Sequence, residues 1–140
     1  MDTIYTDGSC LVNPGGPGGW GFVMEDDEGE VCRHCGGLKK DPTMTNNGAE
    51  YIAVIKAIKH YEELGRPGPL RIRSDSKMLV KQLSGEWGVK GGSYRKFWQG
   101  ARALVEKVSF EIIWEWVPRE QNEVADALSK QGSTAARESS

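Results

Sequence analysis

The sequence has 140 residues, of which 38% are hydrophobic and 27% are charged. This length is typical of one domain that buries roughly two-thirds of its unfolded surface. The chain contains no run of about 18 apolar residues, which excludes a membrane-spanning helix. Residues 1–3 also lack the basic, apolar start of a secretory signal. We therefore expect a protein that does not bind membranes, and we also predict a monomer in the cytoplasm.

The net charge of −2 hides a basic middle segment. Residues 1–50 contain 3 basic and 9 acidic side chains, residues 51–107 contain 12 and 5, and residues 108–140 contain 3 and 6. A single basic face binds phosphates even when the total charge is negative. The charge pattern is therefore compatible with a nucleic-acid partner.

The first predicted strand contains Ile4–Ser9, a short alternating run that stops at Asp7 and is followed by Gly8. An acid at the end of an apolar strand, just before a turn, indicates a functional position for that acid. We expect Asp7 to meet three later acids, Glu50, Asp75 and Asp126, and to hold metal with them.

A hairpin is predicted after the loop of residues 13–19, which is too rich in Gly and Pro for a helix or strand. Its strands are Trp20–Met24 and residues 30–39, joined by a turn at residues 26–29. Three strands in succession imply an antiparallel meander. The loop lacks the Lys and Ser/Thr of a nucleotide-binding phosphate loop.

The clearest predicted helix begins at Thr45, or at one of the two asparagines after it, and ends at Leu64 before Gly65. Glu50 lies near its start, on the same stripe as apolar side chains. One interpretation is a metal-binding acid. The other is a capping box between Asn47 and Glu50, which would satisfy two backbone donors.

The second half of the chain alternates strands and helices. A strand at Leu70–Asp75 ends on an acid that has an alternative interpretation as the N-cap of a short helix at residues 76–83. A glycine-rich stretch at residues 85–93 precedes a helix at residues 94–107. A strand at residues 110–117 then leads to the last helix.

Asn122 is predicted to cap the last helix, which contains Asp126. The alternative interpretation of Asp126 is an exposed ion pair with Lys130, one turn later, worth a few tenths of a kcal/mol. Residues 132–140 are small and polar, and we predict a disordered tail there. The predicted domain is therefore residues 1–131.

This order of elements predicts an α/β fold. A meander followed by strands that are separated by helices implies a mixed sheet, with right-handed parallel crossovers and helices on its faces. In such sheets, sites form at the carboxyl ends of the strands. The positions of Asp7 and Asp75 agree with this rule.

Three cysteines, Cys10, Cys32 and Cys35, are predicted to be reduced thiols. The spacing of Cys32 and Cys35 is also found in zinc and redox sites, but residues three apart on a strand face opposite sides. His34 and His60 are expected to be structural or exposed. A disulfide between Cys10 and either other cysteine requires geometry to judge.

Four motifs in this order resemble those of type 1 ribonuclease H. They are Asp7-Gly8-Ser9, the stretch from Thr45 to Glu50, Ser74-Asp75-Ser76, and the stretch from Asn122 to Leu128. The resemblance implies a five-stranded mixed sheet, with a three-strand antiparallel meander plus two parallel strands. It also implies an endoribonuclease that hydrolyses the RNA strand of RNA–DNA hybrids, with Asp7, Glu50, Asp75 and Asp126 as metal-binding catalytic acids.

The chemistry explains why four acids would converge. Crowded carboxylates repel one another and raise one another's pKa values. Two Mg²⁺ ions, or Mn²⁺ in their place, relieve that repulsion, because hard cations prefer oxygen ligands. Such ions activate a water and stabilise the leaving 3′ oxygen, so that 5′-phosphate and 3′-hydroxyl ends are expected.

The resemblance also implies residues that contact the hybrid, each of which has a structural alternative as a cap, a solvated charge or a buried aromatic. Lys81, Arg95 and Lys96 are further candidates for phosphate contacts. The residues implied for hybrid binding are Gly8, Ser9, Cys10, Asn13, Thr45, Asn46, Asn47, Lys77, Trp87 and Lys90.

Two departures from the family pattern stand out. The loop before the last helix has no histidine. Arg119 is the best candidate for its place, with Glu120 as the runner-up, and would act electrostatically because arginine keeps its proton. The stretch between Leu83 and Tyr94 is too short for the basic protrusion of some members, which implies the compact subgroup. The alternatives are a hybrid-binding module without catalysis, or another nuclease of the same fold.

Overall fold

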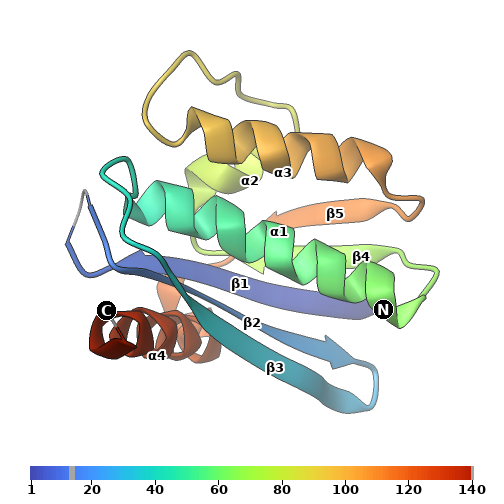
Figure 1. Ribbon diagram of the computed structural model, residues 1–140. Helices are drawn as coiled ribbons and strands as arrows, with labels where there is room; N and C mark the ends of the chain where they lie inside the picture. The colour runs from blue at the N-terminus through green and yellow to red at the C-terminus, as the bar shows by residue number, and fades with distance from the viewer. Residues whose placement is uncertain (13–14, 140) are drawn as a thin grey trace.

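The computed structural model describes residues 1–12 and 15–139. Its centre is a five-stranded sheet with the order β3-β2-β1-β4-β5 (Figure 1). The strands are β1 (Asp2–Cys10), β2 (Gly18–Asp26), β3 (Gly29–Leu38), β4 (Leu70–Ser74) and β5 (Ile112–Trp116). Pairs β1–β2 and β2–β3 are antiparallel, whereas β1–β4 and β4–β5 are parallel. The predicted mixed sheet is confirmed.

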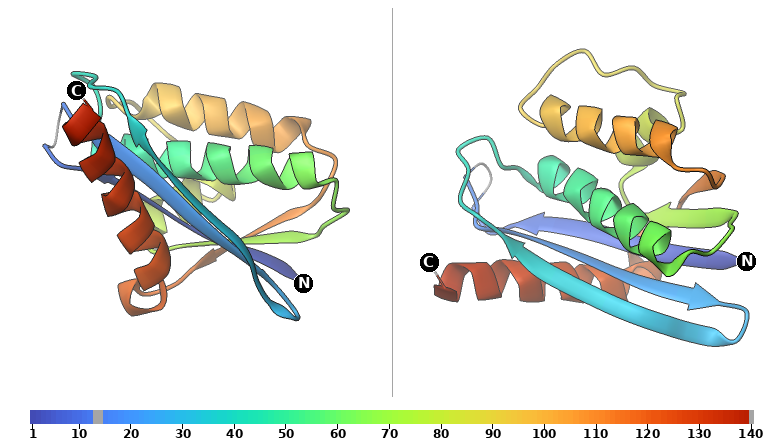
Figure 2. Two further views of the ribbon diagram at one scale, coloured as in Figure 1. Left: turned by 60° about the horizontal axis from the view of Figure 1, so that its bottom comes forward. Right: turned by 45° about the vertical axis from the view of Figure 1, so that its right-hand side comes forward.

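Helices cover both faces of this sheet (Figure 2). Helices α1 (Asn46–Leu64) and α3 (Arg95–Lys107) lie on one face, and α4 (Glu123–Ser139) lies on the other. The short α2 (Lys77–Leu83) and the 3-10 helix η1 (Arg119–Gln121) follow β4 and β5, respectively. None of the described helices is long and apolar enough to cross a membrane.

The main core lies between the sheet and α1. Ile4, Phe22 and Ile72 from the strands meet Tyr51 and Ile58 from the helix, and all five side chains are essentially fully buried. Apolar burial of this kind is worth about 1.5–3 kcal/mol for each large side chain. The core therefore fixes how α1 lies across the sheet.

Strand β1 is longer than predicted. It continues through Asp7 to Cys10, because residues 7–10 pair with Gly18–Gly21 of β2. On its other side, pairing with β4 stops at Tyr5, opposite Arg73. The prediction that the strand ends at Asp7 was therefore wrong, since pairing with β4 stops two residues earlier while pairing with β2 continues to Cys10.

The caps of α1 and α2 exclude two of the structural alternatives. Thr45 caps α1, and its side chain accepts a hydrogen bond from the backbone N–H of Gly48, so no capping box joins Asn47 to Glu50. Ser76 caps α2 by accepting from the N–H of Leu79. Asp75 is therefore not the N-cap, and its carboxyl group is available for another role.

The predicted disordered tail is wrong for residues 132–139, which form the second half of α4. The small, polar composition was the basis of that prediction, but Gly132 is a packing residue. A Cβ atom on Gly132 would overlap the backbone of Gly36 in β3, and one on Gly37 would lie 2.5 Å from the Cβ of Ala136. Contact with the sheet stabilises this half of the helix where its sequence alone would not.

The three cysteines are free thiols, as predicted, and no pairing of Cys10 with Cys32 or Cys35 is present.

Candidate functional site

Asp7 and Asp75 lie together where β1 extends past the end of β4. Pairing of the two strands stops at Tyr5 and Arg73, and Asp75 follows directly after β4. Asp7 and Asp75 each follow their member of this last pair by two residues, so both acids lie at the same edge of the sheet. This is the carboxyl end of two parallel strands, where sites in such sheets form.

Gly8 brings Glu50 to the same place. A Cβ atom on Gly8 would overlap the backbone of Ala49 and Glu50, so only glycine lets the first turns of α1 lie this close to β1. Carboxylate oxygens of Asp7, Glu50 and Asp75 lie within 4.8 Å of one another. Three acids, one on β1, one directly after β4 and one on α1, thus form one cluster.

The electrostatics of this cluster are those of a cation site. Burial, followed by the charge of Asp75, raises the pKa of Asp7 to about 8. Burial raises the pKa of Glu50 to about 7 even though a hydrogen bond with Ser76 opposes the shift. Burial also raises the pKa of Asp75. Burial and mutual repulsion thus disfavour the ionised form of these carboxylates. A divalent ion bound between them would remove the repulsion, so the cluster is suited to bind one.

Asp126 lies at the margin of this cluster. Its hydrogen bond and its charge both contribute to the raised pKa of Asp7, so the two carboxyl groups are neighbours. The alternative interpretation is also observed, because Lys130 Nζ lies 3.1 Å from Asp126 Oδ2. An exposed pair of this kind is worth less than 1 kcal/mol, so it does not prevent Asp126 from binding an ion.

Two polar residues position the acids, and both roles were missed from the sequence. The hydroxyl of Ser129 lies 3.2 Å from Asp7 Oδ2 and 2.8 Å from the carbonyl oxygen of Asp126. The buried Asn122 amide donates to the carbonyl oxygen of Thr6, and its hydrogen bond with Asp75 partly offsets the rise in the pKa of that acid. The signal for Ser129 was its place one turn after Asp126, on the same side of the helix.

The acids border an open hollow of about 490 Å³. The described residues that line it include the four predicted metal ligands and several predicted hybrid contacts. They are Asp7, Gly8, Ser9, Cys10, Leu11, Asn46, Glu50, Asp75, Arg119, Asp126, Lys130 and Thr134.

The predicted hybrid contacts near the acids have structural roles as well. The Cys10 N–H donates to the side-chain oxygen of Asn46 at 2.8 Å, which joins the end of β1 to the start of α1. The Ser9 hydroxyl donates to the carbonyl oxygen of Ser129 at 3.1 Å. Thr45 is the helix cap. Asn13 lies outside the described residues.

Asn47 lies in the first turn of α1, and its side chain is half-buried. It is not among the residues that line the hollow. Its predicted contact with the hybrid stays a prediction.

The other predicted hybrid contacts lie on the surface of α2, on the segment after it and at the start of α3. Lys77, Lys90 and Trp87 are exposed, and the alternative of a buried aromatic is wrong because Trp87 keeps 49% of its surface. Lys81 is paired with Glu86 at 3.1 Å and Lys96 with Asp41 at 3.2 Å. Lys77 and Lys90 therefore remain the better phosphate candidates of this group.

Arg119 reaches the site from η1. Its Nε lies 4.0 Å from Asp75 Oδ2, and its side chain is 85% exposed. It lowers the pKa of both Glu50 and Asp75 by its charge, although burial outweighs it in both cases. The guanidinium is therefore close enough to the acids to contact a phosphate bound there.

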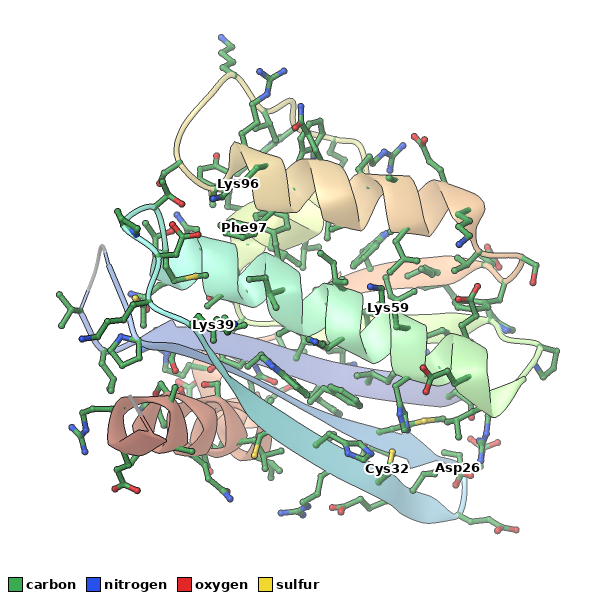
Figure 3. All side chains as sticks on the ribbon, in the orientation of Figure 1. Asp26, Cys32, Lys39, Lys59, Lys96 and Phe97 are labelled. Carbon is green, nitrogen blue, oxygen red and sulfur yellow. The ribbon has the colours of Figure 1, made fainter. Side chains whose placement is uncertain are left out.

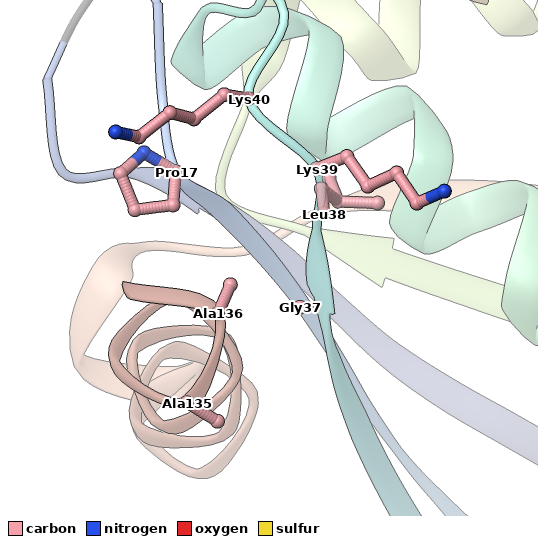
Figure 4. A pocket seen from close by; sticks show the side chains of 7 residues that line it. All are labelled: Pro17, Gly37, Leu38, Lys39, Lys40, Ala135 and Ala136. Carbon is pink, nitrogen blue, oxygen red and sulfur yellow. The ribbon is translucent and has the colours of Figure 1, made fainter. Parts of the chain in front are cut away.

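A second hollow of about 490 Å³ lies between the ends of β3 and α4 (Figure 4). The described residues that line it include Leu38, Lys39, Lys40 and Ala136, and none of them is acidic. It therefore lacks the oxygen ligands that a Mg²⁺ site requires.

Relatives identify the class of this chain. Residues 5–132 match a family model described as reverse transcriptase-like. Ribonuclease H of Polaromonas sp. is 39% identical over 147 residues, which cover 92% of this chain and 86% of that protein. Ribonuclease HI of Caulobacter vibrioides is 34% identical, with 93% of this chain and 91% of that protein covered.

Solved structures show the same fold. The N-terminal RNase H domain of a Mycobacterium tuberculosis protein, fused to maltose binding protein, has a TM-score of 0.84 and 33% identity, covering 99% of this chain and 96% of that one. LC11-RNase H1 in complex with an RNA/DNA hybrid has a TM-score of 0.86 and 27% identity, covering 97% and 99%.

The five-stranded sheet and the acids that meet at its edge define a candidate carboxylate metal site on a mixed α/β fold. The similarity to these relatives identifies the family. The chain belongs to the ribonuclease H family. The predicted family and fold are confirmed.

Proposed function

We propose that this chain is an endoribonuclease that hydrolyses the RNA strand of RNA–DNA hybrids. The observation that supports it most directly is the cluster of Asp7, Glu50 and Asp75, with ligand oxygens within 4.8 Å, in a chain of the ribonuclease H family. A related protein, LC11-RNase H1, has been solved with an RNA/DNA hybrid, which supports the same substrate here.

The four acids would hold two Mg²⁺ ions, or Mn²⁺ in their place. Such a pair supplies an activated water and stabilises the leaving 3′ oxygen of an in-line displacement, which leaves 5′-phosphate and 3′-hydroxyl ends. Asp7 would be the central ligand of the set, because its carboxyl group interacts with Asp75 and Glu50 as well as with Asp126.

The remaining residues of the site bind and orient. Asn122 and Ser129 hold Asp75 and Asp7 in place. Arg119 stabilises negative charge on the phosphate beside Asp75, and Glu50 is placed to accept a hydrogen bond from a 2′-hydroxyl, the group that distinguishes RNA from DNA. Asn46 and Cys10 border the same hollow and are proposed to contact the hybrid.

Cleavage of four labelled substrates tests the proposal. An RNA–DNA hybrid, an RNA duplex, a DNA duplex and single-stranded RNA are incubated with the protein and Mg²⁺ or Mn²⁺. We expect fragments only from the RNA of the hybrid. Cleavage of the DNA duplex would favour another nuclease of the same fold, and binding of the hybrid without cleavage in either metal would favour a binding module.

The matched variant is Asp7→Asn, which removes one charge with little change of shape. We expect it to bind the hybrid and not to cut it. Equal cleavage by wild type and variant would contradict the assignment of Asp7.

The monomeric state and the cytoplasmic location stay predictions. The three free thiols are consistent with a reducing compartment. Sedimentation of the purified protein at several concentrations would measure the oligomeric state directly.

A further inference from the structure

A cysteine and two histidines meet on the side of the sheet covered by α1. Cys32 and His34 are two residues apart on β3, so their side chains face the same side. His60 comes from α1, and ligand atoms of all three lie within 4.8 Å of one another. Figure 3 shows Cys32 on β3 beside α1. The sequence did not predict this cluster, because Cys32 was compared with Cys35 and not with His60.

The cluster rests on an apolar support. Phe22 is opposite His34 in the β2–β3 ladder, and its ring lies 5.3 Å from that of His34 and 5.6 Å from that of His60. The two imidazole centroids are 4.5 Å apart. Since Phe22 is fully buried, it holds both imidazoles at the surface of the core.

The observed spacing fits one metal in particular. The Cys32 Sγ lies 3.6 Å from His60 Nε2. Zinc binds sulfur at about 2.3 Å and nitrogen at about 2.0–2.1 Å in tetrahedral sites, so a bound pair of these atoms is separated by about 3.6 Å. His34 is exposed, and its ligand atom lies within 4.8 Å of ligand atoms of both other residues, so it is the candidate for a third bond.

The protonation states of His60 and Cys32 have opposite effects on metal binding. Burial and the neighbouring His34 lower the pKa of His60, so its imidazole is neutral and keeps a lone pair. Burial raises the pKa of the Cys32 thiol, so an ion must displace a proton there. The simpler interpretation is a weak hydrogen bond between Cys32 and His60, which requires no ion. The metal titration described below distinguishes the two interpretations.

We propose that Cys32, His34 and His60 form a binding site for Zn²⁺ that ties the edge strand β3 to α1. His34 and His60 line a hollow of about 240 Å³ together with Glu63, so water or this carboxylate would be available as a fourth ligand. Lys56 and Lys59 line the same hollow, and their positive charges weaken the attraction of the site for a cation. The negative charge of the Cys32 thiolate strengthens it.

The site is separate from the catalytic acids. His60 follows Glu50 by ten residues in α1, which corresponds to about 15 Å along the helix axis. Its ligands also differ in kind, because sulfur and imidazole nitrogen favour zinc over Mg²⁺. A metal bound here is therefore distinguishable from the catalytic ions.

Cobalt and zinc titrations of the whole chain, in excess Mg²⁺ to occupy the acids, test the proposal. Co²⁺ bound to a thiolate gives a charge-transfer absorption band, which Zn²⁺ then displaces. We expect one equivalent in the wild type, with micromolar or tighter zinc affinity, and a rise in melting temperature on adding zinc. Cys32→Ser is expected to weaken zinc binding at least tenfold and to abolish the thiolate band.

Cys35→Ser is the matched control, since Cys35 lies on the same strand and faces the opposite side. It is expected to leave the band, the affinity and the zinc-dependent melting temperature unchanged. His34→Gln, at an exposed position, is the second variant and is expected to lower the affinity without unfolding the chain. The absence of a thiolate band in the wild type would overturn the proposal, and so would equal affinities in wild type and His34→Gln.

Discussion

Asp7 is 6% exposed, and its carboxyl group interacts with three other acids of the site. Its pKa of about 8 in the folded protein compares with an ordinary value of 3.8. The folded state therefore binds a proton that the unfolded chain releases between about pH 4 and pH 8. In the absence of metal, this group makes the protein less stable as the pH rises through that range.

We predict that Asp7→Asn stabilises the metal-free protein at neutral pH. A gain on the order of 2 kcal/mol is expected, because one pKa unit corresponds to about 1.4 kcal/mol and relaxation of the site reduces the full effect. Denaturant melts in EDTA at pH 5 and pH 8 measure it, and the gain is larger at pH 8. The exposed Asp27→Asn is the control and changes little. A variant less stable than wild type at pH 8 would refute this account.

Arg119 is the second residue whose role is open to a direct test. We predict that Arg119→Ala lowers kcat on a hybrid about tenfold or more, because removal of one charged contact to a phosphate costs about 1.5–3 kcal/mol. Folding is unaffected, since the side chain is 85% exposed. Arg119→Lys retains part of the rate through its charge. Unchanged turnover in Arg119→Ala would remove Arg119 from the mechanism.

At the scale of elements, the close contact of β1 and α1 decides the position of Glu50. We predict that Gly8→Ala destabilises the fold by about 1–3 kcal/mol, because the added methyl overlaps the backbone of Ala49 and Glu50. It also lowers kcat by about 100-fold, since a shift of about 1 Å in a catalytic group has that effect. Unfolding curves and single-turnover cleavage measure the two effects separately.

Gly100→Ala is the matched control in α3. A Cβ atom there meets only Ile55 Cδ1 at 3.6 Å, an ordinary contact. We expect stabilisation by about 0.5–1 kcal/mol from helix propensity, with no change in kcat. If both glycine variants lost activity equally, the effect at Gly8 would not be local.

Local signals in the sequence were sufficient for the elements with their own start and stop residues. Thr45 and Gly65 bound α1 as predicted, because caps act over three or four residues. The second half of α4 was missed because it depends on Gly132 packing against Gly36, nearly a hundred residues earlier. Pattern alone also could not show that His60 reaches Cys32, since that contact depends on how α1 crosses the sheet.

The candidate site, like the fold, could be predicted in part from the sequence. Motif order was enough to choose the four acids, and three of them are shown close together. Ser129 and Asn122 were not recognised as positioning residues, because their partners, Asp7 and Thr6, lie more than a hundred residues away in the sequence.

At the scale of the whole molecule, the charge pattern predicts how binding responds to salt. Residues 51–107 carry a charge of +7 in a chain whose net charge is −2, and residues 84–94 form no helix that could extend a basic protrusion. We predict that the Kd for a hybrid increases steeply with salt, because each phosphate contact contributes about one unit to the logarithmic slope.

Lys90→Ala is expected to reduce that slope by about 1. Arg33→Ala is the control, because Arg33 lies on β3 and is paired with Glu30. Fluorescence anisotropy with a catalytically inactive Asp7→Asn background measures both at several salt concentrations. A Kd that does not respond to salt would contradict a basic binding face.

The contact between Asp7 and Ser129 has a consequence for biosynthesis. These residues are 122 positions apart, so a ribosome adding about 5–20 residues per second completes β1 roughly 6–24 s before it completes the partner turn of α4. A nascent chain that ends between residues 75 and 122 contains Asp7, Glu50 and Asp75 but neither Asp126 nor the helix that orients Asp7. A product of aborted translation that stops before α4 therefore cannot assemble the site, and the order of elements along the chain keeps unfinished molecules inactive.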